Sequence, residues 1–158
     1  MKVIVAIDQT EFANQIIDEV AATEWPLDTQ IKILTVVGSL SSEAEAAAET
    51  AKQLEKRKKF ANDLVMKARQ QISEACPQSM VYAEVRCGEP HLEIIYSAAE
   101  WMPDRILIGA HGNSPNRFFG KIAQSIPQNS TCSVQIVRLK KSKNAAAETV
   151  AGAANVSK

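Results

Sequence analysis

The segment most capable of chemistry begins at Gly109, ends at Lys121 and reads GAHGNSPNRFFGK. It follows a short apolar run and leads into an expected helix. Its glycines, Gly109, Gly112 and Gly120, would let backbone amides approach an anion closely. Arg117 and Lys121 could add charge-assisted contacts to phosphate oxygens. Taken alone, the glycine spacing is equally typical of a tight turn that opens a helix.

Two other side chains could take part in chemistry. Asp8 follows the first apolar run, where a carboxylate could accept hydrogen bonds from a ligand. It could also cap the first helix, as could Thr10. His111 could act as an acid or base, but no Ser, Cys or carboxylate has the spacing that would pair it into a triad. We therefore predict no catalytic residue and no metal site.

Composition gives no support to nucleic-acid or membrane binding. Lys and Arg total 18, as do Asp and Glu, so no net charge draws the chain to a polyanion. No apolar run approaches the roughly 20 residues of a membrane span, and the apolar start meets Asp8 instead of a signal-peptide cleavage site. The cysteines, Cys76, Cys87 and Cys132, are odd in number and widely spaced. They predict free thiols in a reducing compartment, and hence a cytoplasmic protein.

Alternating strands and helices must position these residues. Continuous apolar runs predict buried strands, and apolar stripes with a 3.6-residue period predict helices. The expected strands are residues 3–7, 31–37, 80–87, 105–108 and 134–137. The third strand alternates polar and apolar residues, which predicts a place at an edge of the sheet.

The longest helix should begin near Ser42, which has capping-box spacing with Glu45, and end at Pro77. Its cationic run, residues 56–59, is flanked by acids and lacks aromatic residues. These features favour a solvated helix face over a polyanion site. In the helix that begins at Pro90, the side chains expected to face inward are Leu92, Ile95 and Ala99.

This order predicts an α/β fold, because a strand–helix alternation builds a parallel sheet with helices on both faces. We expect one Rossmann-like domain over residues 1–139 and a polar, Ala-rich tail over residues 140–158. In a sheet of order 3-2-1-4-5, the ligand crevice lies at the carboxyl ends of the first and fourth strands. Those strands are followed by Asp8 and end at Gly109.

Residues 1–139 resemble the universal stress protein family, whose fold is of the adenine nucleotide alpha hydrolase type. The similarity lies in the glycine segment, the apolar strand that ends in Asp8, the Gly88-Glu89-Pro90 helix entry and the DRILIG strand. The resemblance implies that Asp8 accepts hydrogen bonds from a ribose and that Val36 or Val37 contacts the adenine through backbone groups. It implies that the phosphates are surrounded by Gly109, Gly112, Asn113, Gly120 and Lys121.

Two departures from the family pattern affect this segment. Only seven residues separate Gly112 from Gly120, two fewer than in the family's ATP-binding loop, and Lys121 stands where that pattern has a Ser or Thr. A shorter loop presents fewer backbone donors to a triphosphate. Weak ATP binding, a preference for a mono- or diphosphate, and no nucleotide at all therefore remain open.

The function expected is a non-catalytic stress-response or regulatory module that holds ATP, ADP or AMP, with Mg²⁺ accompanying the nucleotide. The resemblance implies a homodimer formed through the last strand, whose ends are Val134 and Val137. Two alternatives remain: a nucleotide-free dimeric scaffold and a weak nucleotide hydrolase. A hydrolase would need a metal carboxylate pair, an activated nucleophile or a full P-loop, and Gly120-Lys121 is followed by Ile122.

Overall fold

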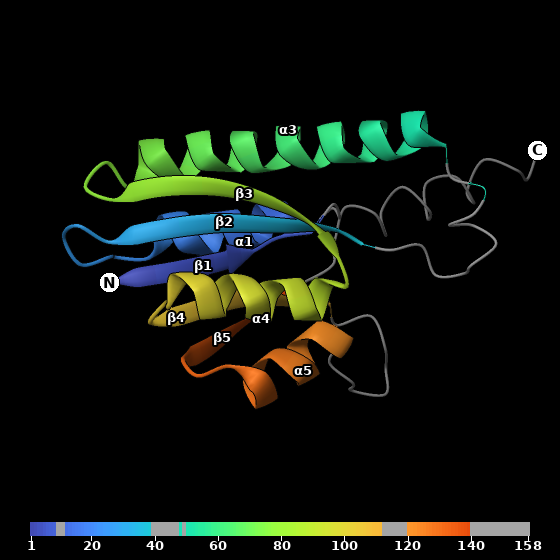
Figure 1. Ribbon diagram of the computed structural model, residues 1–158. Helices are drawn as coiled ribbons and strands as arrows, with labels where there is room; N and C mark the ends of the chain where they lie inside the picture. Colours follow the sequence, from blue (N-terminus) through green and yellow to red (C-terminus); the bar gives the residue numbers. More distant parts are fainter. Residues whose placement is uncertain (9–11, 39–47, 49, 112–119, 140–158) are drawn as a thin grey trace, which may run out of the picture.

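The computed structural model describes residues 1–8, 12–38, 48, 50–111 and 120–139. Strands and helices alternate along these ranges (Figure 1). They are β1 (Lys2–Ala6), α1 (Ala13–Ala22), β2 (Gln30–Gly38), α3 (Ala51–Ala75), β3 (Met80–Gly88), α4 (Pro90–Trp101), β4 (Arg105–His111), α5 (Lys121–Asn129) and β5 (Ser133–Leu139). The predicted tail, residues 140–158, lies outside the described residues.

The strands form one parallel sheet in the order β3-β2-β1-β4-β5, which confirms the predicted fold class. The central strand is β1, where Val5 lies opposite Ile33 of β2 on one side and Leu107 of β4 on the other. β3 forms one edge of the sheet, as its alternating sequence predicted, and β5 forms the other. A helix connects each strand to the next, as parallel pairing requires.

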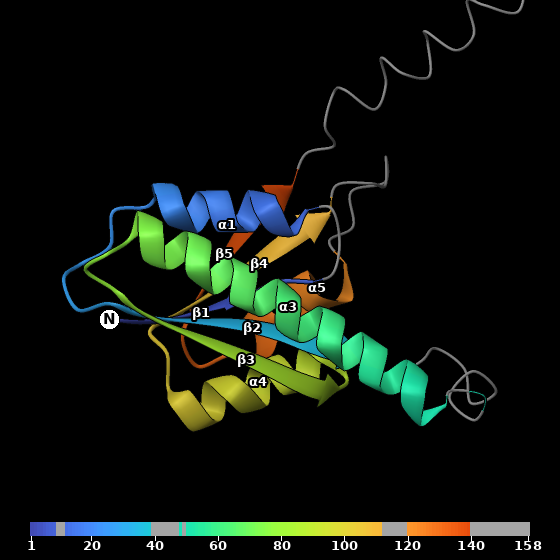
Figure 2. The same cartoon turned by 90° about the horizontal axis from the view of Figure 1, so that it is seen from above.

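Helices cover both faces of this sheet (Figures 1 and 2). α1 and α3 pack on one face against a core that includes Val3 and Val5, and α4 and α5 pack on the other against Ile4 and Ile106. These four side chains are fully buried. Because successive residues of a strand point to opposite faces, β1 contributes to both cores and reads as a continuous apolar run.

α3 begins later than the sequence predicted. Thr50 is its N-cap: the Thr50 hydroxyl accepts a hydrogen bond from the Gln53 amide at 3.3 Å, and Gln53 Oε1 accepts one from the Thr50 amide at 2.8 Å. The backbone of Thr50 is extended, so a helix that started at Ser42 could not continue through it unbroken. The prediction is therefore wrong at this end. Ser42 and Glu45 themselves lie outside the described residues.

The inward face of α4 also differs from the prediction. The buried side chains of α4 are Ile94 and Ser97, whereas Leu92 and Ala99 are exposed and Ile95 is half-buried. The helix is turned so that a polar residue faces the sheet, which an apolar-stripe argument does not anticipate. In the part of the chain that the structure describes, no helix combines the length and apolar character needed to cross a membrane.

Candidate functional site

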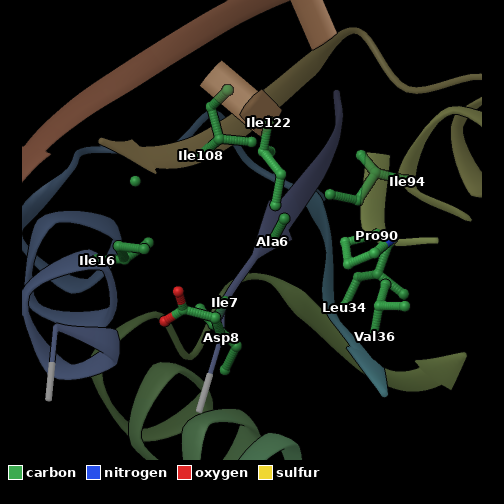
Figure 3. Close-up of a pocket in the computed structure, with 11 residues that line it drawn as sticks. Ala6, Ile7, Asp8, Ile16, Leu34, Val36, Pro90, Ile94, Ile108 and Ile122 are labelled. Atoms are coloured by element: carbon green, nitrogen blue, oxygen red, sulfur yellow. The ribbon is translucent and has the colours of Figure 1, made fainter. Parts of the chain in front are cut away.

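A cavity of about 260 Å³ lies where the carboxyl ends of β1 and β4 meet (Figure 3). The residues that line it come from both faces of the sheet. They are Ala6, Ile7, Asp8, Ile16, Leu34, Val36, Pro90, Ile94, Ile108, Gly109 and Ile122. Asp8 is the one residue in this set with a charged side chain, so the described part of the cavity wall is apolar with a single carboxylate.

The topology of the sheet explains why the cavity is here. From β1 the chain crosses to β2 through α1 on one face, and from β4 it crosses to β5 through α5 on the other face. The two connections leave adjacent strands in opposite directions, so neither covers the space between them. The predicted crevice is therefore present, and it is bounded by Ile16 of α1 and Ile122 of α5.

The backbone that leads into Asp8 is fixed by its neighbour β2. The Ile7 amide donates to the Leu34 carbonyl at 2.9 Å, and the buried Thr35 hydroxyl donates to the Ile7 carbonyl at 2.8 Å. These bonds hold the chain one residue past the end of β1. Asp8 is half-buried and lines the cavity, as predicted.

The two valines at the end of β2 have different positions. Val36 lines the cavity, together with Leu34 on the same face of the strand. Val37 points to the opposite face, where it is buried, and it is absent from the cavity lining. Because side chains alternate along a strand, only one of two neighbours can face the pocket. The side chain of Val36, and not that of Val37, thus lines the cavity, while the predicted backbone contact with a base stays a prediction for both.

The glycine segment is described at its two ends. Gly109 lines the cavity from β4. Gly120 is the N-cap of α5, and Lys121 is the first residue of that helix; both are exposed and neither lines the cavity. A Cβ built on Gly120 would meet no described atom within 4 Å, so packing among the described residues does not demand glycine there. Gly112 and Asn113 lie outside the described residues.

Sequence reasoning missed the apolar walls of the site. Pro90 and Ile94 close it from α4, Ile16 from α1 and Ile122 from α5. Their one sequence signal was the Gly-Glu-Pro entry to α4, because apolar residues on helices are expected in the core whether or not they line a cavity. Among the described residues, no group of three or more His, Cys, Asp or Glu side chains is placed to hold a metal ion.

Comparison with known proteins identifies the family. The sequence profile of the universal stress protein family matches residues 1–138. This chain belongs to the universal stress protein family. Comparison with curated protein sequences finds no significant match.

Solved structures share the fold of this universal stress protein. The universal stress protein UspA from Lactobacillus plantarum is 20% identical, with a TM-score of 0.67 over 87% of this chain and 97% of that one. A family protein from Arabidopsis thaliana with AMP bound is 16% identical, with a TM-score of 0.65 over 89% and 93% of the two chains. A universal stress protein in complex with cAMP is 16% identical, with a TM-score of 0.57 over 89% and 98%.

Proposed function

We propose that this protein binds an adenine nucleotide in the cavity between β1 and β4 and acts as a non-catalytic, dimeric stress-response module. The observation that carries the proposal is the apolar cavity with one carboxylate, Asp8, at the switch point of the sheet. Two structures of the same fold are described with AMP and with cAMP bound. Both ligands combine an apolar base with a ribose and a single phosphate.

Each part of a nucleotide has a matching surface. The base would pack among the aliphatic side chains that line the cavity. The backbone at Val36, toward the C-terminal end of β2, would supply its polar contacts. Asp8 would accept hydrogen bonds from ribose hydroxyls. The cavity volume of about 260 Å³ lies near the lower limit for ligand pockets, so the phosphates would extend out of it.

The phosphates would lie toward the start of α5. Ile122 lines the cavity, and Lys121 and Gly120 precede it directly. The amide groups at a helix N-terminus favour an anion, and Lys121 adds a positive charge. Gly112 and Asn113, from the same segment, complete the proposed phosphate site. Magnesium would enter with a di- or triphosphate and be held by phosphate oxygens and water.

Binding without hydrolysis is the part of the proposal that concerns catalysis. Among the described residues that line the cavity, Asp8 is the one titratable side chain, so these residues offer no paired acid and base. The three cysteines are free, as expected of a protein in the reducing cytoplasm.

Dimerisation through β5 is supported by the sheet. In the described residues β5 pairs with β4 on one side, and Val134, Ile136 and Val137 are only partly buried. A free strand edge with apolar side chains invites a second strand. Sedimentation equilibrium should give twice the 17.2 kDa of one chain. A concentration-independent monomer would contradict this part of the proposal.

Calorimetric titration of nucleotide-free protein with AMP, ADP and ATP tests the binding site. Asp8→Asn should weaken binding about tenfold or more, because it replaces a charged acceptor of ribose hydrogen bonds by a neutral one. Asp28→Asn is the matched control: it changes the same kind of residue, in the loop that leads into β2, and should leave affinity unchanged. No heat from any nucleotide, or equal affinities for wild type and Asp8→Asn, would refute the site. ATP turnover abolished by Lys121→Ala would favour a hydrolase.

A further inference from the structure

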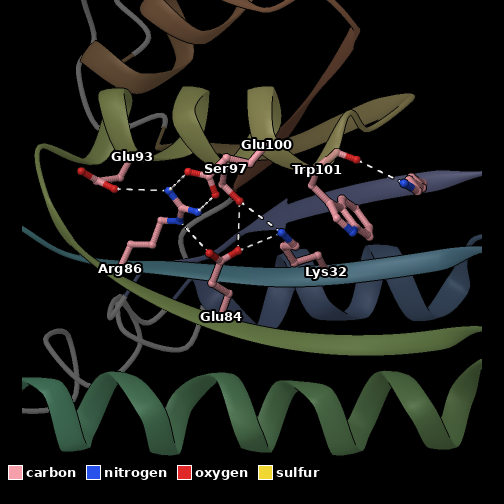
Figure 4. A network of polar contacts seen from close by, with 8 residues as sticks. Lys32, Glu84, Arg86, Glu93, Ser97, Glu100 and Trp101 are labelled. Atoms are coloured by element: carbon pink, nitrogen blue, oxygen red, sulfur yellow. Dashed lines mark hydrogen bonds and ion pairs between the residues drawn. The ribbon is translucent and has the colours of Figure 1, made fainter.

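The sheet face beneath α4 changes from apolar to charged between β2 and β3. Leu34 and Val36 of β2 line the cavity, and in the register of the two strands they lie opposite Glu84 and Arg86 of β3. The charged pair therefore stands directly beside the cavity wall. It lies beneath the helix, α4, that supplies the adjoining wall (Figures 3 and 4).

Glu84 is the inner member of this pair. Its carboxylate accepts from Lys32 Nζ at 3.0 Å, from the fully buried Ser97 hydroxyl at 3.0 Å and from Arg86 Nε at 2.6 Å. Lys32 Nζ also lies 4.7 Å from the ring centroid of Trp101, in the last turn of α4. Glu84 thus connects β2, β3 and the middle of α4.

Arg86 connects β3 to both ends of α4. Its Nη1 lies 3.6 Å from Glu93 Oε2, in the first turn, and its Nη2 forms an ion pair with Glu100 Oε2, near the last turn (Figure 4). Glu93, Ser97 and Glu100 follow the i, i+4, i+7 spacing of one helix face. One guanidinium thus links β3 to both ends of α4, alongside the Ser97–Glu84 hydrogen bond and the packing of Ile94.

The same sheet-facing side of α4 also forms the apolar wall of the cavity. Pro90 and Ile94 line it, and they flank Glu93 in the same first turn. A rigid helix cannot move Glu93 without moving Pro90 and Ile94. We propose that Arg86 is a positioning residue of the nucleotide site: its ion pairs hold α4 so that this apolar wall fits the base. The inference rests on the proposed function and names the contact that sets the shape of its site.

The charges of this network are stable near neutral pH. The hydrogen bond to Glu100 raises the pKa of Arg86 above its ordinary value, although burial opposes this. Burial disfavours ionisation of Glu84, but hydrogen bonds from Lys32, Arg86 and Ser97 outweigh that effect and lower its pKa. Both partners are therefore ionised over the physiological range, and α4 is held throughout it.

Arg86→Met tests the inference, because methionine keeps the apolar stem and removes the guanidinium. The matched control is Arg69→Met on α3, since Arg69 Nε donates to the Val81 carbonyl of the same strand, from the opposite face, at 3.1 Å. In calorimetric titrations with AMP, Arg86→Met should weaken binding about tenfold, a coupling typical of packed networks. Arg69→Met should stay within about twofold of wild type. Arg86→Lys keeps the positive charge but loses the forked guanidinium group, so its AMP affinity should be intermediate between those of wild type and Arg86→Met.

Amide hydrogen exchange separates this inference from the proposed function. The amides of Leu92 and Glu93 donate to the Glu89 carbonyl in the first turn of α4, and they should exchange faster in Arg86→Met but not in Arg69→Met. Equal AMP affinities for Arg86→Met and Arg69→Met would overturn the inference. If wild type binds no AMP, the nucleotide proposal fails. Hydrogen exchange then decides whether Arg86 positions α4: unchanged exchange at Leu92 and Glu93 in Arg86→Met would overturn that role. If Arg86→Met does not fold, Arg86→Lys provides the same comparison.

Discussion

Gly88, at the end of β3, is the backbone position on which the entry to α4 depends. Its φ is +146°, a value that residues with a side chain rarely adopt, and the chain turns there from β3 into Pro90. A Cβ on Gly88 would lie 2.7 Å from Glu93 Oε1 and 3.0 Å from Glu93 Cγ. Gly88→Ala should therefore strain the turn and displace the carboxylate that binds Arg86.

The two effects of Gly88→Ala can be estimated separately. A non-glycine residue held in this region of φ costs about 1–3 kcal/mol. Displacing Glu93, whose side chain is 21% exposed, forfeits an ion pair with Arg86 that contributes up to about 1 kcal/mol. We expect the free energy of unfolding to fall by about 2–3 kcal/mol in total. For a domain of this size, the melting temperature should fall by about 5–10 °C.

Urea unfolding followed by circular dichroism measures this change, and a double-mutant cycle separates its causes. Glu93→Ala removes the three atoms nearest to the new Cβ, which lie 2.7–3.1 Å from it, so in its background Gly88→Ala should cost mainly the backbone strain. Gly38→Ala is the control: Gly38 is the register partner of Gly88, and its Cβ would make an ordinary 3.7 Å contact with Pro90. We expect less than about 0.5 kcal/mol there. Equal losses for Gly88→Ala and Gly38→Ala would refute the reasoning.

Three further predictions concern pH, the helix entry and thiol reactivity. The pKa of Glu84 in the folded protein lies below its ordinary 4.5, so its contacts stabilise the fold above that pH and are lost as pH falls through the lower value. In urea unfolding, the free energy of unfolding should therefore fall more steeply with acid for wild type than for Glu84→Gln. Gly120→Val should leave the melting temperature within about 2 °C of wild type, because a Cβ there meets no described atom within 4 Å, and it should weaken AMP binding in calorimetry; a large loss of stability would contradict this. Iodoacetamide should label exposed Cys87 in the native protein. It should spare Cys76 until the protein unfolds, because burial raises the pKa of the Cys76 thiol. Equal labelling rates of the two cysteines, followed by mass spectrometry, would be inconsistent with the structure.

The sheet could be predicted from sequence because its signals are local and strong. β1 reads as a continuous apolar run since both of its faces are covered, and β3 alternates since it lies at an edge. The start of α3 was predicted too early, because the capping-box spacing of Ser42 and Glu45 was read as its start, whereas the N-cap of α3 is Thr50, which has the same spacing to Gln53. Local spacing does not decide between equivalent caps.

The residues that line the candidate site were predictable only in part. Asp8 and Gly109 were identified because parallel strands bring their carboxyl ends together, a consequence of topology. Val36 could not be distinguished from Val37, since the face of a strand depends on register and not on residue type. The wall formed by Pro90 and Ile94 escaped prediction because it depends on how α4 is rotated about its axis, which is a tertiary property.

The rotation of α4 shows why a polar stripe can be mistaken for a solvent face. Glu93, Ser97 and Glu100 have helical spacing, and charges at such positions usually face water. Here Glu93 and Glu100 face Arg86, and Ser97 donates to Glu84, on an edge strand where nearby solvent limits the cost of burying charge.

This arrangement makes the two edges of the sheet chemically different. Glu84 and Arg86 place charges beside the β3 edge, and inward-pointing charges disfavour the addition of another strand. β5 instead presents Val134, Ile136 and Val137, which are only partly covered. A second chain would therefore meet less desolvation cost at β5 than at β3. The charges of Glu84 and Arg86 would thus direct the proposed self-association away from the β3 edge and leave β5 as its site.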